Sequence, residues 1–195
     1  MRESADVRRQ SLIDATAQCL AERGVTGTSV RAISKLAGVS SGLLTHYFDG
    51  IDSLILATYR DLGKRVSLAT DRAVEAAGSD PRARLEAFVL ASFAPPVLDP
   101  KLLVTWVAFW SLVHGRSDMA QAHAEMYTQY RNDLSEHLAA VRPEKDAAGI
   151  RLAAIGIAAL VDGLWLELCL DPATFTVEEA YALARGCIES HVGRN

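Results

Sequence analysis

The feature that most constrains the fold is the helical spacing of apolar residues along almost the whole chain. Stripes of this kind recur at Leu12, Ala15, Thr16, Cys19 and Leu20, at Val30, Ile33, Leu36 and Ala37, and at Leu54, Ile55, Thr58, Tyr59 and Leu62. Residues three and four apart lie on one face of a helix, whereas a half-buried strand alternates every second residue. No convincing alternating segment with hairpin turn residues occurs. The sequence therefore predicts an all-α fold.

Glycine, proline and capping residues divide this pattern into about nine helices. Gly24, Gly38 and Asp49-Gly50 separate the first four, and proline- or glycine-containing breaks separate the rest. The predicted helices span about 7–23, 28–37, 40–48, 51–78, 81–93, 100–114, 117–140, 144–170 and 177–192. The chain is long enough for one or two domains with a real core.

The second and third of these helices have the proportions of a helix-turn-helix. Gly38 permits a tight turn, Val39 fills the angle between the helices, and Ser40 caps the next helix. A Gly-Val-Ser turn between short helices also occurs in ordinary helix packing, so the turn alone leaves both interpretations open.

The charge is unevenly distributed, which bears on the partner that such a turn would contact. The whole chain carries a net charge of −4. Residues 1–65 hold 9 Lys/Arg and 7 Asp/Glu, a net of +2, so the other 130 residues carry a net of −6. Any contact with a polyanion such as DNA is therefore expected at the N-terminal third.

Several functional classes lack their usual signals. The cysteines Cys19, Cys169 and Cys187 have no metal-ligand spacing and are expected to be buried thiols in a reducing cytosol. The five histidines are scattered, with no catalytic triad, phosphate-binding loop or HExxH site. The apolar run Leu152–Leu170 is interrupted by Asp162 and Glu167 and is expected to be a buried helix. We expect no enzyme, metal, cofactor or membrane span.

A set of N-terminal residues resembles the TetR family of transcriptional repressors. The matching residues are Leu12-Ile13-Asp14-Ala15, Gly24, Thr28 to Ile33, Ala37 to Gly42, His46-Tyr47-Phe48 and Leu54. The resemblance covers roughly residues 7–60. It implies an all-α dimer with a helix-turn-helix DNA-binding domain, placed at 6–66, and an effector-binding and dimerisation domain, placed at 67–195.

Docking of the third helix in the major groove predicts which side chains contact DNA. Ser41, Leu43 and Thr45 are expected at base edges or thymine methyl groups, and Gly42 allows close approach. The family resemblance assigns His46 and Tyr47 to the phosphate backbone; for Tyr47 a core position is the alternative.

Two further groups of residues complete the expected DNA contacts. Thr28 and Ser29 can offer hydroxyl and backbone N–H groups to a phosphate. Arg8 and Arg9 can reach the backbone or the minor groove, the alternative being a solvated helix end. The chain departs from the family where Ile51, between Asp49 and Asp52, replaces the usual lysine; the two carboxylates are expected to repel a phosphate.

The C-terminal two-thirds contains the candidates for effector binding. Trp106, Phe109 and Trp110 share a helix face, and Trp165 follows Asp162. These two runs resemble the BetI-type, choline-responsive branch of the family. Aromatic faces and a carboxylate suit a quaternary ammonium, which has no N–H to donate. Trp106, Phe109, Trp110 and Trp165, with Tyr127 or Tyr130, and Asp162 as counter-charge, are therefore the expected site. The alternatives are aromatics that belong to the core and a structural pairing of Asp162.

The combined expectation is a ligand-responsive repressor. Its partners are a palindromic double-stranded operator, a small cationic effector and a second copy bound through the last two helices, Glu144–Leu170 and Thr176–Val192. The alternatives are an enzyme and a helical ligand- or partner-binding protein with weak or lost DNA binding.

Overall fold

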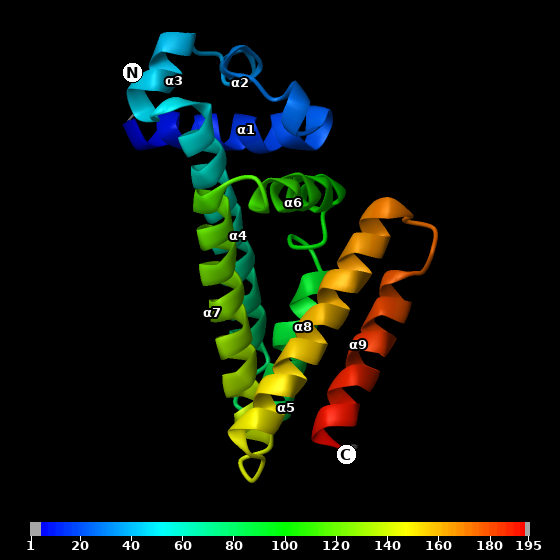
Figure 1. Cartoon of the computed structure of the whole chain (residues 1–195). Helices are drawn as coiled ribbons and strands as arrows, with labels where there is room; N and C mark the ends of the chain where they lie inside the picture. The colour runs from blue at the N-terminus through cyan, green and yellow to red at the C-terminus, as the bar shows by residue number, and fades with distance from the viewer. Residues whose placement is uncertain (1–4, 194–195) are drawn as a thin grey trace. The chain divides into compact units, whose positions relative to one another are not determined.

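The computed structural model describes residues 5–193, and over this range the chain forms nine α-helices and one short 3-10 helix, with no strand (Figure 1). The elements are α1 (Ala5–Gly27), α2 (Val30–Leu36), α3 (Ser41–Tyr47), α4 (Gly50–Ala76), α5 (Pro81–Leu90), η1 (Ala91–Phe93), α6 (Pro100–Val113), α7 (Ser117–Val141), α8 (Ala147–Leu170) and α9 (Val177–Val192). The predicted all-α class with about nine helices is confirmed.

Side-chain caps explain where several helices begin. Ser29, Asp80, Asp146 and Thr176 each accept a hydrogen bond from a backbone N–H of the first helical turn. Asp146 places the start of α8 at Ala147, so the predicted start at about 144 is too early. At Gly24 the backbone leaves the helical region, with φ 63° and ψ −172°, but helical structure resumes to Gly27. The predicted break at Gly24 is therefore present as a kink inside α1, and α1 does not end there.

The helices form two compact units that are not contiguous in sequence. The first unit comprises the chain through Arg65 together with Pro100–His123, and the second comprises Val66–Asp99 and the chain from Ala124 onward. By this grouping α6 belongs with the N-terminal helices. The domain boundary at residues 66 and 67 remains a prediction.

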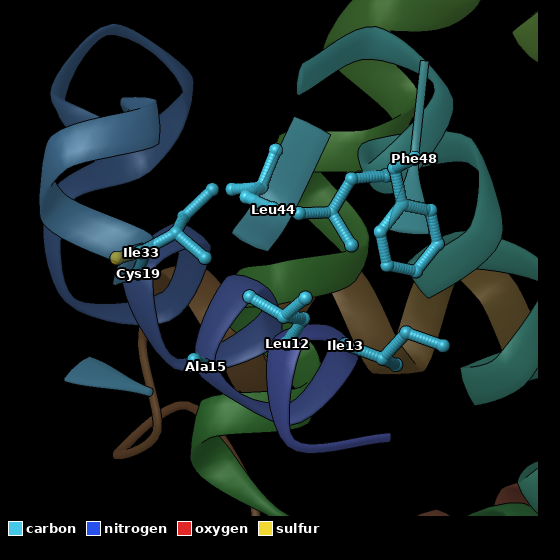
Figure 2. Packing of buried hydrophobic residues seen from close by; sticks show 8 residues of the cluster. Leu12, Ile13, Ala15, Cys19, Ile33, Leu44 and Phe48 are labelled. Atoms are coloured by element: carbon cyan, nitrogen blue, oxygen red, sulfur yellow. The ribbon is translucent and has the colours of Figure 1, made fainter. Parts of the chain in front are cut away.

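The first unit is held together by an apolar core shared by its N-terminal helices. Buried side chains of α1 pack with Ile33 of α2, Leu44 of α3 and Phe48 (Figure 2). Leu44 is fully buried, and such burial stabilises a fold by about 1.5–3 kcal/mol. A seven-residue helix is unstable by itself. Its stability therefore comes from this core.

The second unit includes the antiparallel pair α8 and α9 (Figure 1). The indole N–H of Trp165 on α8 donates to the carbonyl of Ser92 at 2.7 Å. The hydroxyl of Tyr181 on α9 donates to the carbonyl of Phe93 at 3.2 Å. Helices α8 and α9 thus each stabilise the short helix η1 through one side-chain hydrogen bond to its backbone.

Helix α8 is long and apolar enough to pass as a membrane span by length and composition, the one such helix in residues 5–193. Core helices of soluble proteins pass the same test. Ile157, Val161 and Leu164 are buried inside the fold, as expected for a core helix. The helix gives only weak grounds for a membrane position.

The three cysteines are free thiols with different exposure. Cys19 is buried, whereas Cys169 and Cys187 are only partly buried, so the prediction of three buried thiols is correct for Cys19 alone. Burial raises the pKa of all three thiols, which disfavours the reactive thiolate form.

Candidate functional site

Helices α2 and α3 are joined by a tight turn of the kind the sequence predicts. Gly38 adopts φ 65°, a conformation that glycine takes without strain. The amide of Val39 donates to the carbonyl of Ser34 at 3.0 Å, and the Ser40 hydroxyl accepts from the amide of Leu43 at 3.3 Å. The turn and the cap together fix the direction in which α3 leaves α2.

Helix α3 has a buried side and an exposed side. Leu44 faces the core, while Ser41, Gly42, Thr45 and His46 are exposed. A Cβ added at Gly42 would meet nothing within 4 Å. Internal packing therefore does not require glycine at this position, and the exposed side is free for close approach by a partner.

The remaining residues of the predicted reading helix lie at its edge. Leu43 and Tyr47 are half-buried, and Tyr47 packs against the core cluster while its ring meets His46 edge-on at 5.2 Å between centroids. Phe48 is buried, as expected of a core residue. The two interpretations of Tyr47 are thus compatible, because one part of the ring packs and another part is exposed.

The two residues before α2 differ in what they can offer. The Thr28 hydroxyl is used inside the fold, donating to the carbonyl of Gly24 at 2.7 Å, and Thr28 is buried. Ser29 is exposed, and its hydroxyl accepts from the amide of Ala32 at 3.2 Å. Ser29 is therefore the better placed of the two for a phosphate contact.

The arginines at the start of α1 are not equivalent. The guanidinium of Arg9 lies over the ring of Phe48, 4.9 Å from its centroid. Arg9 is exposed and Arg8 is half-buried. The contact with Phe48 holds Arg9 next to the C-terminal end of α3, where its charge can support binding of a polyanion.

The departure from the family pattern at Ile51 has a structural setting that the sequence did not reveal. Ile51 is half-buried against the core cluster. Arg116 donates to the Asp52 carboxylate at 2.7 Å and to the Asp52 carbonyl at 3.0 Å, and also pairs with Asp118. One guanidinium is thus shared by Asp52 and Asp118 and offsets only part of the charge of the exposed Asp52, so the repulsion expected from Asp49 and Asp52 remains a prediction.

In the first unit, the aromatic residues of α6 pack as a core. Trp106 and Phe109 are buried and meet the ring of Tyr59 edge-on, at 5.1 and 4.9 Å between centroids. The indole N–H groups of Trp106 and Trp110 are buried and have no hydrogen-bond partner within the described chain. The packing of Trp106 and Phe109 fits the core alternative for these two residues.

In the second unit, other predicted effector residues lie near the half-buried carboxylate of Asp162. The Tyr127 hydroxyl donates to Asp162 at 3.1 Å. Burial raises the pKa of Asp162 to about 6, although the Tyr127 hydrogen bond and the positive charge of Arg131 favour its ionised form. The ring of Tyr130 stacks on Phe88 with centroids 5.3 Å apart, and Trp165 is fixed by Ser92. Tyr127 and Asp162 are thus brought together, while Trp106 and Phe109 belong to the other unit.

A cleft in the second unit was not anticipated. It has a volume of about 510 Å³, and its lining includes Asp71, Glu75, Arg84, Asp133, Glu136 and His137. Burial and the nearby Arg84 lower the pKa of His137. The acidic residues recur at helical spacing on α4 and α7, but their approach to each other depends on tertiary packing. No cluster suited to a metal ion occurs in residues 5–193.

Two protein families match the chain, one at each end. Residues 12–58 match the family of bacterial regulatory proteins called the tetR family. Residues 81–193 match the C-terminal domain of BetI-type transcriptional repressors. Residues 12–58 contain the helix-turn-helix. Residues 81–193 contain Tyr127, Tyr130, Asp162 and Trp165, which we call the Asp162 region.

Similar proteins agree with these matches over nearly the full length. The chain is 37% identical over 185 residues to the HTH-type transcriptional regulator BetI of Burkholderia thailandensis, covering 94% of this chain and 93% of that protein. It is 36% identical to BetI of Paraburkholderia phymatum, covering 94% and 92%. A crystal structure of a transcriptional regulator from Pseudomonas aeruginosa PAO1 superposes with a TM-score of 0.88 and 38% identity, covering 97% and 92%.

One structural neighbour was solved with a small molecule. It is a transcriptional regulator from Saccharomonospora viridis in complex with choline, with a TM-score of 0.83 and coverage of 97% and 100%. Its identity to this chain is 18%, so the similarity concerns the fold alone.

Proposed function

Because the chain belongs to the TetR family and carries a BetI-type C-terminal domain, we propose that it is a homodimeric repressor released from a palindromic operator by a small cationic effector. It is a transcriptional regulator and not an enzyme, as expected from the scattered histidines. We place it in the cytoplasm, where regulators of this kind generally act. No membrane partner is part of the proposal.

The observation that carries the DNA-binding part is the two-sided helix α3. Its buried Leu44 fixes the helix to the core, and its exposed side presents Ser41, Gly42 and Thr45. Small polar side chains on a fixed helix can approach base edges in the major groove. His46, Tyr47, Ser29 and the arginines Arg8 and Arg9 supply the phosphate contacts in this proposal.

An exposed apolar stripe supports the proposed dimer. Leu152, Ile155, Leu166 and Leu170 lie exposed on α8, with Leu152 and Leu170 64% and 67% exposed, and Leu183 is 51% exposed on α9. The α8 residues follow the spacing of one helix face. An apolar stripe on two adjacent helices suits a self-complementary interface with two-fold symmetry. Two recognition helices must then lie about 34 Å apart to read a palindrome.

The effector part of the proposal rests on the Asp162 region. Removing much of a carboxylate from water, as at the half-buried Asp162, is costly unless a positive charge or hydrogen bonds compensate it. Tyr127 provides one hydrogen bond, and Tyr130 and Trp165 provide aromatic surface nearby. A quaternary ammonium would satisfy the charge of Asp162 and contact the rings. A neighbour of the same fold was solved with choline, and we propose the same class of ligand here.

A gel-shift or fluorescence-anisotropy experiment tests the proposal. The purified protein is titrated against DNA from upstream of its own gene at about 50 mM salt, where phosphate contacts are strong, with and without choline. We expect binding without choline and weakened binding with it. Thr45→Ala should weaken specific binding, and Thr128→Ala, at an exposed position of α7, is the matched control. No binding to this DNA or to neighbouring promoters would favour a ligand- or partner-binding protein that has lost DNA contact.

A further inference from the structure

The hydroxyl group of Tyr130 on α7 is buried and has no hydrogen-bond partner within the described part of the chain. The Ser92 side chain interacts with this hydroxyl and favours its ionised form, but the pair does not meet hydrogen-bonding geometry. Nearly all buried hydroxyl groups in proteins are paired, and one without a partner is destabilising. The position therefore calls for a partner that the chain itself does not supply.

The ring that carries this hydroxyl is fixed. Tyr130 stacks on Phe88 with the ring planes 24° apart, so its hydroxyl keeps one direction. By contrast, the hydroxyl of Tyr181 in the same unit has the carbonyl of Phe93 as its acceptor. The lack of a hydrogen-bond partner is thus specific to Tyr130 and is not shared by Tyr181.

Tyr130 also lies close to the carboxylate that the proposed effector would neutralise. Tyr127, one helical turn earlier on α7, donates to Asp162, and the charge of Asp162 acts on the Tyr130 hydroxyl. The two tyrosines differ in that the Tyr127 hydroxyl is occupied by Asp162 whereas that of Tyr130 is unpaired. The negatively charged carboxylate of Asp162 and the unpaired hydroxyl of Tyr130 therefore lie near each other.

We propose that Tyr130 is the specificity-determining residue for the effector, pairing with an oxygen atom of a small cation whose ammonium group faces Asp162. This inference rests on the proposed function and narrows it. The effector is then a hydroxyalkyl quaternary ammonium, such as choline, rather than a tetraalkylammonium of the same size. Asp162 contributes affinity for any cation of this class, and Tyr130 distinguishes cations that carry an oxygen.

Two ligands of equal charge and similar shape test whether Tyr130 distinguishes cations that carry an oxygen atom. Choline and propyltrimethylammonium differ by a hydroxyl in place of a methyl group. Their dissociation constants are measured by calorimetry on the full-length wild type, Tyr130→Phe and Tyr181→Phe. We expect wild type to bind choline about 5- to 100-fold more tightly, because the analogue leaves the hydroxyl unpaired. Tyr130→Phe keeps the stacked ring and should bind the two ligands within about twofold. Tyr181→Phe should keep the wild-type preference.

Two outcomes would overturn the role of Tyr130 alone, and a third would also overturn the proposed class of effector. Equal affinity of wild type for both ligands would overturn the role of Tyr130 and leave the cationic effector of the proposed function intact. A preference for choline that persists in Tyr130→Phe would also overturn that role. If wild type bound neither ligand, the quaternary ammonium class and this inference would both be wrong.

Discussion

The helix α3 and the Asp162 region both present polar groups, but they do so in opposite environments. On α3 the polar side chains are exposed above a fully buried Leu44, so solvent can satisfy them when no partner is bound. By contrast, the carboxylate of Asp162 is half-buried, and the nearby Tyr130 hydroxyl is buried and unpaired. The polar groups of α3 therefore need no ligand to be satisfied, whereas in the proposed effector site a bound ligand would supply the partner that the Tyr130 hydroxyl lacks.

The largest expected effect separates the two sides of α3. Leu44→Ala should lower the free energy of unfolding by about 2–5 kcal/mol, because it leaves a cavity in the core. Thr45→Ala, on the exposed side, should change it by less than about 0.5 kcal/mol. Urea unfolding followed by circular dichroism measures both. Similar losses in the two variants would show that α3 does not have the two sides described.

The next prediction concerns the cost of burying Asp162. Its pKa of about 6 lies above the ordinary value of 3.8, so between these values the folded chain holds a proton that the unfolded chain has lost. Stability from this group is therefore full below about pH 4, falls as the pH rises to about 6, and stays low above it. Asp162→Asn should raise the free energy of unfolding at about pH 7.5 by about 1–3 kcal/mol and weaken binding of choline.

The difference in the free energy of unfolding between wild type and Asp162→Asn isolates the contribution of the Asp162 carboxyl group. Tyr127, Tyr130 and Arg131 act on Asp162 in both pH conditions, and the asparagine of the variant can still accept from Tyr127. Burial lowers the pKa of His137 and His191, which gives wild type and variant the same opposite slope in this range. Urea unfolding at about pH 4.5 and about pH 7.5 should show a clearly larger gap at the higher pH. An equal gap at both would contradict the raised pKa.

A smaller effect is expected for the two tyrosine hydroxyls. Tyr181→Phe removes a hydrogen bond to the Phe93 carbonyl and should lower the free energy of unfolding by about 0.5–1.5 kcal/mol. Tyr130→Phe removes an unpaired hydroxyl and should leave stability unchanged or slightly raised in the absence of effector. Thermal unfolding of the ligand-free variants distinguishes them. A larger loss for Tyr130→Phe would mean that its hydroxyl is paired in solution.

The smallest expected effect concerns DNA affinity at Ile51. Ile51→Lys should strengthen binding to all DNA sequences and steepen the salt dependence by about one unit of log–log slope, because a lysine there would contact one more phosphate. Ile51→Gln is the matched control for lost packing against the core. An unchanged slope in a salt titration of the lysine variant would place residue 51 away from the DNA backbone.

Local sequence signals predicted the helix-turn-helix well. Gly38, Ser29 and Ser40 act through their own backbone and the next turn, so their effect depends on neighbours in sequence. The apolar spacing likewise placed Leu12 and Ile33 on buried faces. Helix starts that depend on one capping side chain, such as Asp146 before α8, were less well predicted.

Contacts between distant residues were mostly beyond the sequence. Arg116 reaches Asp52 across 64 positions, and no local pattern pairs them. Helical spacing indicated that Trp106 and Phe109 share a face, but not that this face packs on Tyr59. Tyr127 and Asp162 were both in the expected effector group, but Tyr127 was expected as an aromatic face and not as a hydrogen-bond donor to Asp162. Periodicity thus identifies a buried face without identifying what covers it.

The central claim is that one protein binds both an operator and a cation, and that each weakens binding of the other. The most direct test is the dissociation constant of choline measured with and without saturating upstream DNA, together with that of the DNA measured with and without saturating choline. We expect both ligands to bind, and each to weaken the other by the same factor, as linkage requires. Tight binding of both ligands with no change in either constant would contradict the account.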